Sequence, residues 1–487
     1  MKFYDIMFRK NSVALVALIL VSTCNFAQKG TQSPYSVFGI GELNMGQYAA
    51  FMSMGGVSMA CTDSTIANFN NPASYAFFNR NRPVFQIGMN GKFSTFETSS
   101  SSSNQRYLGL NQFQLGLPIK KNWGASFGLL PYSFTGYTIA NYSIDYSTDS
   151  DGDTSIFVNE GSGAVSKVFL GVAFKAINSS RLDTNYSKKD TAIVLKTHIL
   201  SLGVHGNYLF GTSTKTQSFE RFYYVGIGNY NSRVESSLRI SNPTTDFGFT
   251  YQYYFRPVHV DSLINGSISI GASYSPAFKL RAYQDLTSYT YGGNFYLDSV
   301  QYAYVIDTVE NVVDNKGSIY IPEQYKLGIE YRIGWQPSRK GERLLRLACD
   351  VNFQKWSAFY EEFGGSQSVS PFRDRLSLGF GMEYSPVVGN DPTISILSRT
   401  NYRFGFNYTQ TELSINGTNL DNYGMSFGIG IPLNINSTNT NVNLGATLGN
   451  MGTTSGGLIR ERYIGVYFGI SIIPDRNELW FVKRKYD

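Results

Sequence analysis

Long runs of alternating apolar and polar residues constrain the fold of this 487-residue chain more than any other feature. The clearest run places six apolar side chains on one face: Tyr423, Met425, Phe427, Ile429, Ile431 and Leu433. Gly and Ser dominate the opposite face of that run. Similar alternation covers residues 327–333, 376–384, 442–448 and 464–472. A period of two residues indicates β-strands with one apolar face and one polar face.

Strand length and side-chain chemistry separate two fold classes that would both alternate, a soluble sandwich and a membrane barrel. The runs are about 9–15 residues long, which suits tilted transmembrane strands better than soluble strands of about 5–6 residues. Their apolar faces carry almost no charge, whereas the other faces mix Gly, Ser, Asn, Glu and Arg. Aromatic residues make up 15% of the chain, as belts at two water–lipid boundaries require. We therefore predict an all-β, antiparallel transmembrane β-barrel of about fourteen strands between about residues 84 and 473.

The chain divides into four predicted parts. Residues 1–27 read as an export signal, because Lys2, Arg9 and Lys10 precede a nine-residue apolar run at 13–21. Cys24 leaves a lipoprotein signal open as an alternative. Residues 28–80 form a predicted hatch, residues 81–473 the barrel, and residues 474–487 a periplasmic C-terminal tail. The signal and the barrel together place the protein in the bacterial outer membrane.

The hatch prediction rests on residues 55–75, a Gly-, Ser-, Ala- and Asn-rich stretch ahead of the first strand. Its tetrapeptide Asn70, Asn71, Pro72, Ala73 initiates a turn and cannot continue a strand. Together with residues 54–60 it resembles the N-terminal hatch of FadL-type outer-membrane transporters. That resemblance implies a plug that gates a fourteen-stranded barrel. A plain Asn-Pro turn is the alternative.

Pro131 interrupts the third predicted strand, where it costs a hydrogen bond or forces a bulge. In the FadL-type family an inward kink of the third strand opens the wall and lets a hydrophobic ligand leave sideways. By resemblance, Pro131 is a candidate for such a lateral opening. The alternative is a proline at the outer rim, where strand pairing has ended.

The connections are predicted to be short on one rim and long on the other. Residues 118–122 join two strands tightly, while residues 148–162, 283–317 and 358–371 read as long polar loops. The stretch 294–317 is unusually apolar for a loop. Its candidate ligand-gathering residues are Phe295, Tyr296, Leu297, Tyr302 and Tyr304. It could equally consist of strands above the membrane, or form a patch that binds a partner.

Signals for catalysis, cofactors and metals are weak. The chain has three His, and no nucleophile motif, zinc spacing or P-loop is present. An enzyme would become a candidate only if His205 faced a Ser and an acid within hydrogen-bond reach. Residues 149–154 resemble the start of a Ca²⁺ loop, but their glycine is fourth instead of sixth. A net charge of +6 is too small and too dispersed for nucleic-acid binding.

Two functions remain open from the sequence. The first is an outer-membrane channel for passive uptake of a hydrophobic small molecule, such as a fatty acid, with a lateral exit into lipid. The second is a non-transport barrel that serves as a scaffold subunit of a secretion or barrel-assembly machine, with other envelope proteins as partners. Neither requires a cofactor, and neither is an enzyme.

Overall fold

The computed structural model describes residues 30–44, 47–80, 82–145, 153–186, 191–222, 230–257, 264–297, 300–335, 342–369, 372–388, 394–435 and 438–474. The predicted export signal and most of the C-terminal tail lie outside the described residues, as does the start of the Ca²⁺-loop-like stretch. The short helices are η1 (Pro34–Val37), α2 (Ala49–Met52), η2 (Pro72–Phe77), η3 (Trp356–Ala358), α3 (Ile396–Arg399) and η4 (Ser455–Gly457). Among the described residues, helices long and apolar enough to cross a membrane are absent.

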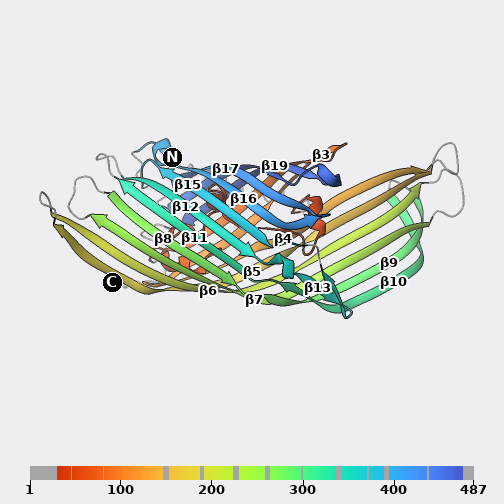
Figure 1. Ribbon diagram of the computed structural model, residues 1–487, viewed down its shortest axis with the longest axis horizontal. Helices are drawn as coiled ribbons and strands as arrows, with labels where there is room; N and C mark the ends of the chain where they lie inside the picture. Colours follow the sequence, from red (N-terminus) through yellow and green to blue (C-terminus); the bar gives the residue numbers. More distant parts are fainter. Residues whose placement is uncertain are drawn as a thin grey trace, which may run out of the picture.

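Fourteen antiparallel strands close into a barrel, because the last strand pairs with the first along its whole length (Figure 1). They are β2 (Val84–Glu97), β3 (Ser102–Lys120), β4 (Trp123–Asp145), β5 (Asp153–Tyr186), β6 (Thr191–Phe222), β7 (Tyr230–Pro257), β8 (Ile264–Ser275), β11 (Gln324–Trp335), β12 (Arg343–Gln354), β15 (Arg375–Ser385), β16 (Asn401–Ile415), β17 (Thr418–Ile435), β18 (Thr438–Met451) and β19 (Arg460–Ile473). The predicted fold class and strand number are confirmed.

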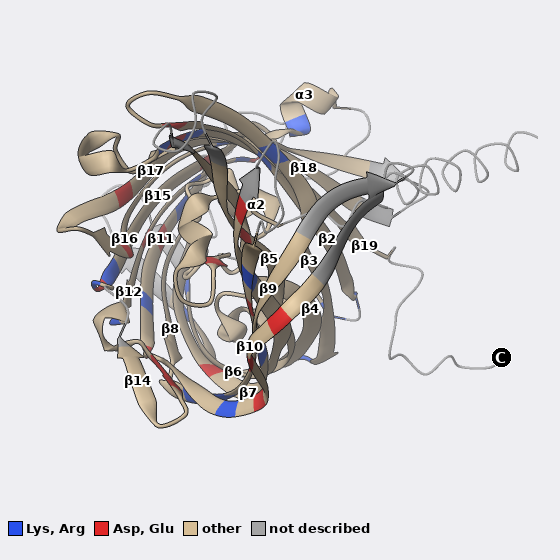
Figure 2. Cartoon of the chain, turned by 90° about the vertical axis from the view of Figure 1, so that its right-hand side faces the viewer, with Lys and Arg blue, Asp and Glu red and all other residues tan. Residues whose placement is uncertain are grey.

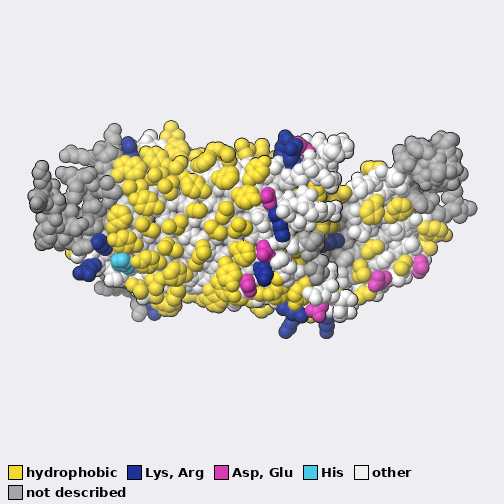
Figure 3. Space-filling model, in the orientation of Figure 1, with side chains coloured by type: hydrophobic (Ala, Val, Ile, Leu, Met, Phe, Trp, Pro, Cys, Tyr) yellow, Lys and Arg dark blue, Asp and Glu magenta, His cyan; other side chains and the backbone are white. Residues whose placement is uncertain are grey.

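The outer surface of the barrel is a broad apolar belt (Figure 3). Alternate residues of each strand point outward, so Ile329, Phe380 and Phe427 are each about half exposed, at 51%, 46% and 48%. Exposed apolar area of this extent is stable only against lipid. A closed barrel also satisfies its own backbone hydrogen bonds, as a membrane demands. The protein is therefore an outer-membrane barrel.

Two hairpins continue the wall beyond the belt. Strands β9 (Phe278–Leu297) and β10 (Val300–Ile321) form the hairpin that we call the outer extension. Strand β7 pairs with β8 through residues 247–255 and with β9 through residues 230–240, so one long strand carries both. A second hairpin, β13 (Tyr360–Phe363) and β14 (Ser366–Val369), follows η3. Both hairpins lie at the rim opposite the end of β19, which is the extracellular rim if long excursions face outward.

The prediction of long loops at 148–162, 283–317 and 358–371 is wrong. From residue 153 to 162 the chain belongs to β5, and the other two stretches are largely the hairpins β9–β10 and β13–β14. These strands lack clean alternation because water, not lipid or a core, meets much of their surface. Backbone pairing holds them as strands without a buried face.

The described residues between 30 and 80, which we call the N-terminal segment, lie inside the ring. Helix α2 is visible within it in the end-on view of Figure 2. The segment hydrogen-bonds to side chains from opposite sides of the barrel, including Thr250 on β7, Asp350 on β12 and Ser426 on β17. Its short strand β1 (Glu42–Leu43) pairs with β4. A segment that meets strands all round a closed ring occupies the lumen.

Candidate functional site: the occupied lumen

The Asn-Pro-Ala motif fastens the N-terminal segment to the wall. Asn71 caps η2, since its side-chain oxygen accepts a hydrogen bond from the Ala73 amide at 3.1 Å. Its Nδ2 donates to the carbonyl of Met59 at 2.7 Å and to the carbonyl of Phe249 on β7 at 3.0 Å. On β6, Ser201 Oγ donates to the Ala73 carbonyl at 2.7 Å. Asn71 therefore makes the local Asn-Pro turn and also crosses to the barrel.

Glycines on the inner wall make room for the backbone of the N-terminal segment. A Cβ at Gly124 would overlap the carbonyl oxygen of Tyr75, and one at Gly271 would overlap that of Met59. At Gly203 a Cβ would lie 2.5 Å from the Ala73 nitrogen. At Gly405 it would overlap the Gly55 nitrogen. These glycines lie on β4, β8, β6 and β16, so the segment presses on the wall around the ring.

A row of buried charges crosses four neighbouring strands. We call it the charge row; it comprises the half-buried Arg332 and four buried residues, Glu330, Arg346, Glu383 and Arg403. Arg403 Nε lies 2.5 Å from Glu383 Oε2, and Arg346 Nη1 lies 3.6 Å from Glu383 Oε1. The pairing register explains this, because Arg346, Glu383 and Arg403 are direct cross-strand neighbours. The polar face that the sequence predicts to line a wet lumen forms ion pairs between neighbouring strands here.

The charge row also binds the N-terminal segment through Asp63. Arg346 Nη2 lies 3.5 Å from Asp63 Oδ2. Burial alone would raise the pKa of Asp63, but the guanidinium groups of Arg346 and Arg332 outweigh it and hold that pKa below its usual range. On the same strand as Arg346, Asp350 Oδ2 accepts from the backbone amides of Ser58 and Met59, at 2.6 and 2.9 Å. Charge thus anchors one side of the segment as the Asn-Pro-Ala motif anchors the other.

The wall is interrupted beside Pro131, on the third barrel strand as predicted. Strands β3 and β4 pair only up to Phe113 and Leu129. On the other side β4 stays paired with β5 through Pro131, with a bulge before Ser133. Beyond Leu129 the β3–β4 seam therefore lacks a ladder among the described residues.

Residues 40–44 of the N-terminal segment, which we call the strap, lie across this seam. Within the strap, Glu42 and Leu43 pair with Phe134 and Ser133 of β4. Asn44 Nδ2 donates to Asn111 Oδ1 on β3 at 3.3 Å and to the Pro131 carbonyl at 3.4 Å. The strap thus bridges β3 and β4 where their own pairing has ended.

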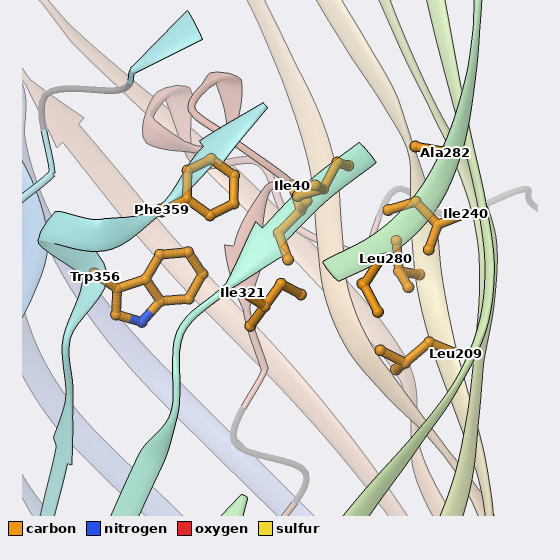
Figure 4. Packing of buried hydrophobic residues seen from close by; sticks show 10 residues of the cluster. Ile40, Leu209, Ile240, Leu280, Ala282, Ile321, Trp356 and Phe359 are labelled. Atoms are coloured by element: carbon orange, nitrogen blue, oxygen red, sulfur yellow. The ribbon is translucent and has the colours of Figure 1, made fainter. Parts of the chain in front are cut away.

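Aromatic and aliphatic side chains pack together inside the ring where the two hairpins begin (Figure 4). Trp356 and Phe359, from the connection between β12 and β15, are 2% and 1% exposed. They pack with Ile40 of the strap and with Leu280 and Ile319 of the outer extension. A cavity of about 320 Å³ borders this cluster at Ile40 and Trp356. Its lining mixes apolar side chains such as Leu130 and Phe372 with charged ones such as Lys326 and Glu412.

His205 does not meet the condition set for an enzyme. Its Nε2 lies 2.7 Å from the Tyr75 hydroxyl, and its Nδ1 lies 3.8 Å from Asp246 Oδ2, beyond hydrogen-bond reach. Phe69 stacks on the ring at 5.1 Å. The contacts of His205 therefore help to hold η2 in place. Among the described residues, His205 contacts a tyrosine hydroxyl and not the serine that such an enzyme would need as its nucleophile. Groups of His, Cys, Asp and Glu able to hold a metal are absent from the described part of the chain.

The predicted site residues fall in three separate places. Asn70 to Ala73 lie in the lumen, and Pro131 lies at the seam. Phe295, Tyr296 and Leu297 belong to β9, while Tyr302 and Tyr304 belong to β10. For residues 294–317 the sequence left open strands above the membrane as an alternative to a loop. The structure has strands there. Sequence reasoning missed Asp350 and Ser426, whose only signal was a polar residue on an inner face.

A family model for BamG matches residues 7–187 and 191–487. The chain belongs to the BamG family. No curated protein matches it. Solved structures similar to this BamG-family chain include the Ralstonia pickettii toluene transporter TbuX, at 13% identity over 87% of this chain and 97% of that one, with a TM-score of 0.42. A Pseudomonas aeruginosa FadL homologue has 13% identity over 88% and 98%, with a TM-score of 0.47.

The CymD monoaromatic hydrocarbon channel has 12% identity over 89% of this chain and 98% of that one, with a TM-score of 0.44. A FadL homologue, of the family that the sequence resembles, is thus among the structures similar to this chain. Identities and TM-scores this low do not assign to this chain the molecules that those channels carry.

Proposed function

We propose that this BamG-family chain is a sealed outer-membrane barrel that serves as a scaffold subunit of a secretion or barrel-assembly machine. The observation that carries the proposal is the occupied lumen. The N-terminal segment is fastened to β6, β7, β12 and β17, and the Trp356 cluster covers the other end. A barrel closed in this way can bind partners through its rims and its outer surface, but not through its interior. Membership of the BamG family favours the same function.

The interior is built for retention of the N-terminal segment. Among the anchoring groups Ser201, Thr250 and Ser426 are buried and Asp350 is half-buried, and the charge row would be left with unpaired charge if the segment left. Leaving a buried polar group unsatisfied costs about 1–3 kcal/mol, and more for a charge. Several such costs together oppose any routine movement of the segment, which a conducting channel of this type would need.

The test combines co-purification with conductance. We expect the intact protein, extracted in mild detergent, to keep stoichiometric envelope proteins bound and to show no channel conductance in planar bilayers. Deleting Asn70 to Ala73 should raise the conductance, because Asn71 then no longer joins Met59 to β7.

The control is replacement of Ser100, in the exposed turn between β2 and β3, by Ala. This variant should show no channel conductance. Purification of the chain without protein partners would contradict the scaffold function. Unchanged conductance after the deletion would argue separately against a hatch.

The second candidate function is uptake of a hydrophobic molecule, and the β3–β4 seam beside Pro131 is the observation that favours it. The cavity borders the strap at Glu42 and Leu43, so movement of the strap would join the cavity to the lipid. In this function the strap, with Pro131, controls a lateral exit.

Locking the strap tests this second function. Asn44 and Asn111 touch through the ends of their side chains, so cysteines at both positions should be joined across the seam by a short bis-methanethiosulfonate cross-linker. If ligand leaves there, cross-linking should abolish uptake of a fluorescent fatty acid into liposomes, and reductant should restore it. Either single cysteine variant is the control. Equal uptake in the locked and reduced protein would exclude the seam as the exit.

A further inference from the structure

The outer extension ends in a strand with a free edge. Strand β10 pairs with β9 over most of its length, but it pairs with β13 only at residues 317–320. Between Val300 and Lys316 its backbone therefore has a described neighbour on one side only. A free edge presents backbone N–H and C=O groups as a template for another strand.

This edge is exposed on both of its faces. Every residue from 305 to 311 is exposed, and four apolar side chains are exposed to between 43% and 68%: Val305, Ile306, Val309 and Val313. The pairing with β9 contains bulges, which natural edges use for protection. Lys, Arg and Pro, the usual protecting residues, do not occur between 300 and 315. An apolar edge of this kind is typical of a surface that a partner covers.

The charge of the edge indicates the chemistry of that partner. Asp307 and Glu310 are exposed, and their carboxylates form no ion pair with the described residues. Asp314 differs, because Arg239 of β7 pairs with it. Figure 3 shows acidic and apolar side chains together near the tip of the outer extension.

The two free carboxylates discriminate among occupants. Antiparallel pairing with a second copy would bring Asp307 and Glu310 of both chains close together, and like charges opposite one another are destabilising. Anionic lipid would be repelled in the same way. A strand with Lys or Arg beside apolar residues would hydrogen-bond to the backbone of the edge. It would also cover the exposed valines and pair with the two carboxylates.

We propose that β10, between Val305 and Val313, binds an extended basic segment of a partner protein by strand addition. The inference rests on the scaffold function and names one contact through which the scaffold acts. Because the outer extension lies beyond the apolar belt on the extracellular rim, the partner segment is exposed at the cell surface.

The direct test uses a labelled ten-residue peptide of alternating Val and Lys with the purified full-length protein in detergent. We expect binding that falls at least tenfold when Glu replaces Lys, and that is lost when alternate amides of the peptide are N-methylated. The double variant Asp307→Asn, Glu310→Gln should weaken binding about fivefold to tenfold. The control variant Glu97→Gln, Glu160→Gln removes equal charge on β2 and β5, away from β10, and should bind like the parent. Equal binding of the Lys and Glu peptides, or of the N-methylated peptide, would overturn the proposal.

A second measurement separates this inference from the scaffold function. A photo-crosslinker at the exposed Thr308 should capture a partner through a basic, extended segment, and one at the barrel-wall residue Thr95 should not. If the envelope proteins co-purify but Thr308 captures none of them, the strand-addition site is wrong and the scaffold stands. If no protein co-purifies, the scaffold itself fails.

Discussion

Replacing Gly405 by Ala should dislodge the N-terminal segment from the lumen. A Cβ at this position would overlap the Gly55 nitrogen and the Met54 carbonyl carbon, which are backbone atoms that no side-chain rotation can move. The same shift would break the hydrogen bond from the Gly55 amide to Ser426 Oγ, now 2.8 Å long. Overpacking and the lost hydrogen bond together should cost about 2–4 kcal/mol. Gly55 has φ +70°, so its turn has little freedom to adapt.

Limited proteolysis of the folded barrel measures this effect. We expect the N-terminal segment of the Gly405→Ala protein to be cut at least tenfold faster than in the parent, with a rise in bilayer conductance. Gly109→Ala is the matched control, because it lies on β3 and a Cβ there would meet no atom within 4 Å. Alanine at such an open position should be neutral or slightly stabilising. Equal protease resistance of the two variants would show that Gly405 does not support the segment.

The barrel itself could be predicted from the sequence because its periodicity is local. Each strand carries its own alternation, so Val84 and Ile473 appear as the outer limits and Pro131 falls on the third strand without any knowledge of pairing. The outer extension could not be predicted this way. Residues 305–311 of β10 are exposed on both faces, and a strand without a buried face leaves no pattern of period two.

The interior could be predicted only in part, for a different reason. Alternation places Arg346, Glu383 and Arg403 on inner faces, but it permits any even shift of one strand against the next. Only the pairing register makes these three residues neighbours. The anchors of the N-terminal segment are still less visible, since Asp350 is far from Ser58 in the sequence and its role depends on how the segment is seated.

Replacing Glu383 by Met should destabilise the barrel strongly. The charge row and Asp63 together hold three guanidinium groups and three carboxylates: Arg332, Arg346, Arg403, Glu330, Glu383 and Asp63. Loss of Glu383 leaves Arg403, whose side chain is 3% exposed, with Asn443 as its remaining described partner. An uncompensated buried charge costs about 3–5 kcal/mol.

The double variant Glu383→Met, Arg403→Met decides between charge and packing as the cause. It removes the stranded cation, while Arg346 keeps Glu330 and Asp63, so it should be more stable than Glu383→Met alone. Urea unfolding in lipid vesicles gives the free energy of unfolding of the parent and of both variants. Arg239→Met, which breaks two exposed ion pairs, should lower that free energy by less than about 1 kcal/mol. A double variant less stable than Glu383→Met would mean that the row stabilises the barrel by its packing volume. A single variant with an unchanged free energy of unfolding would mean that water reaches the row, and the lumen would then be wet after all.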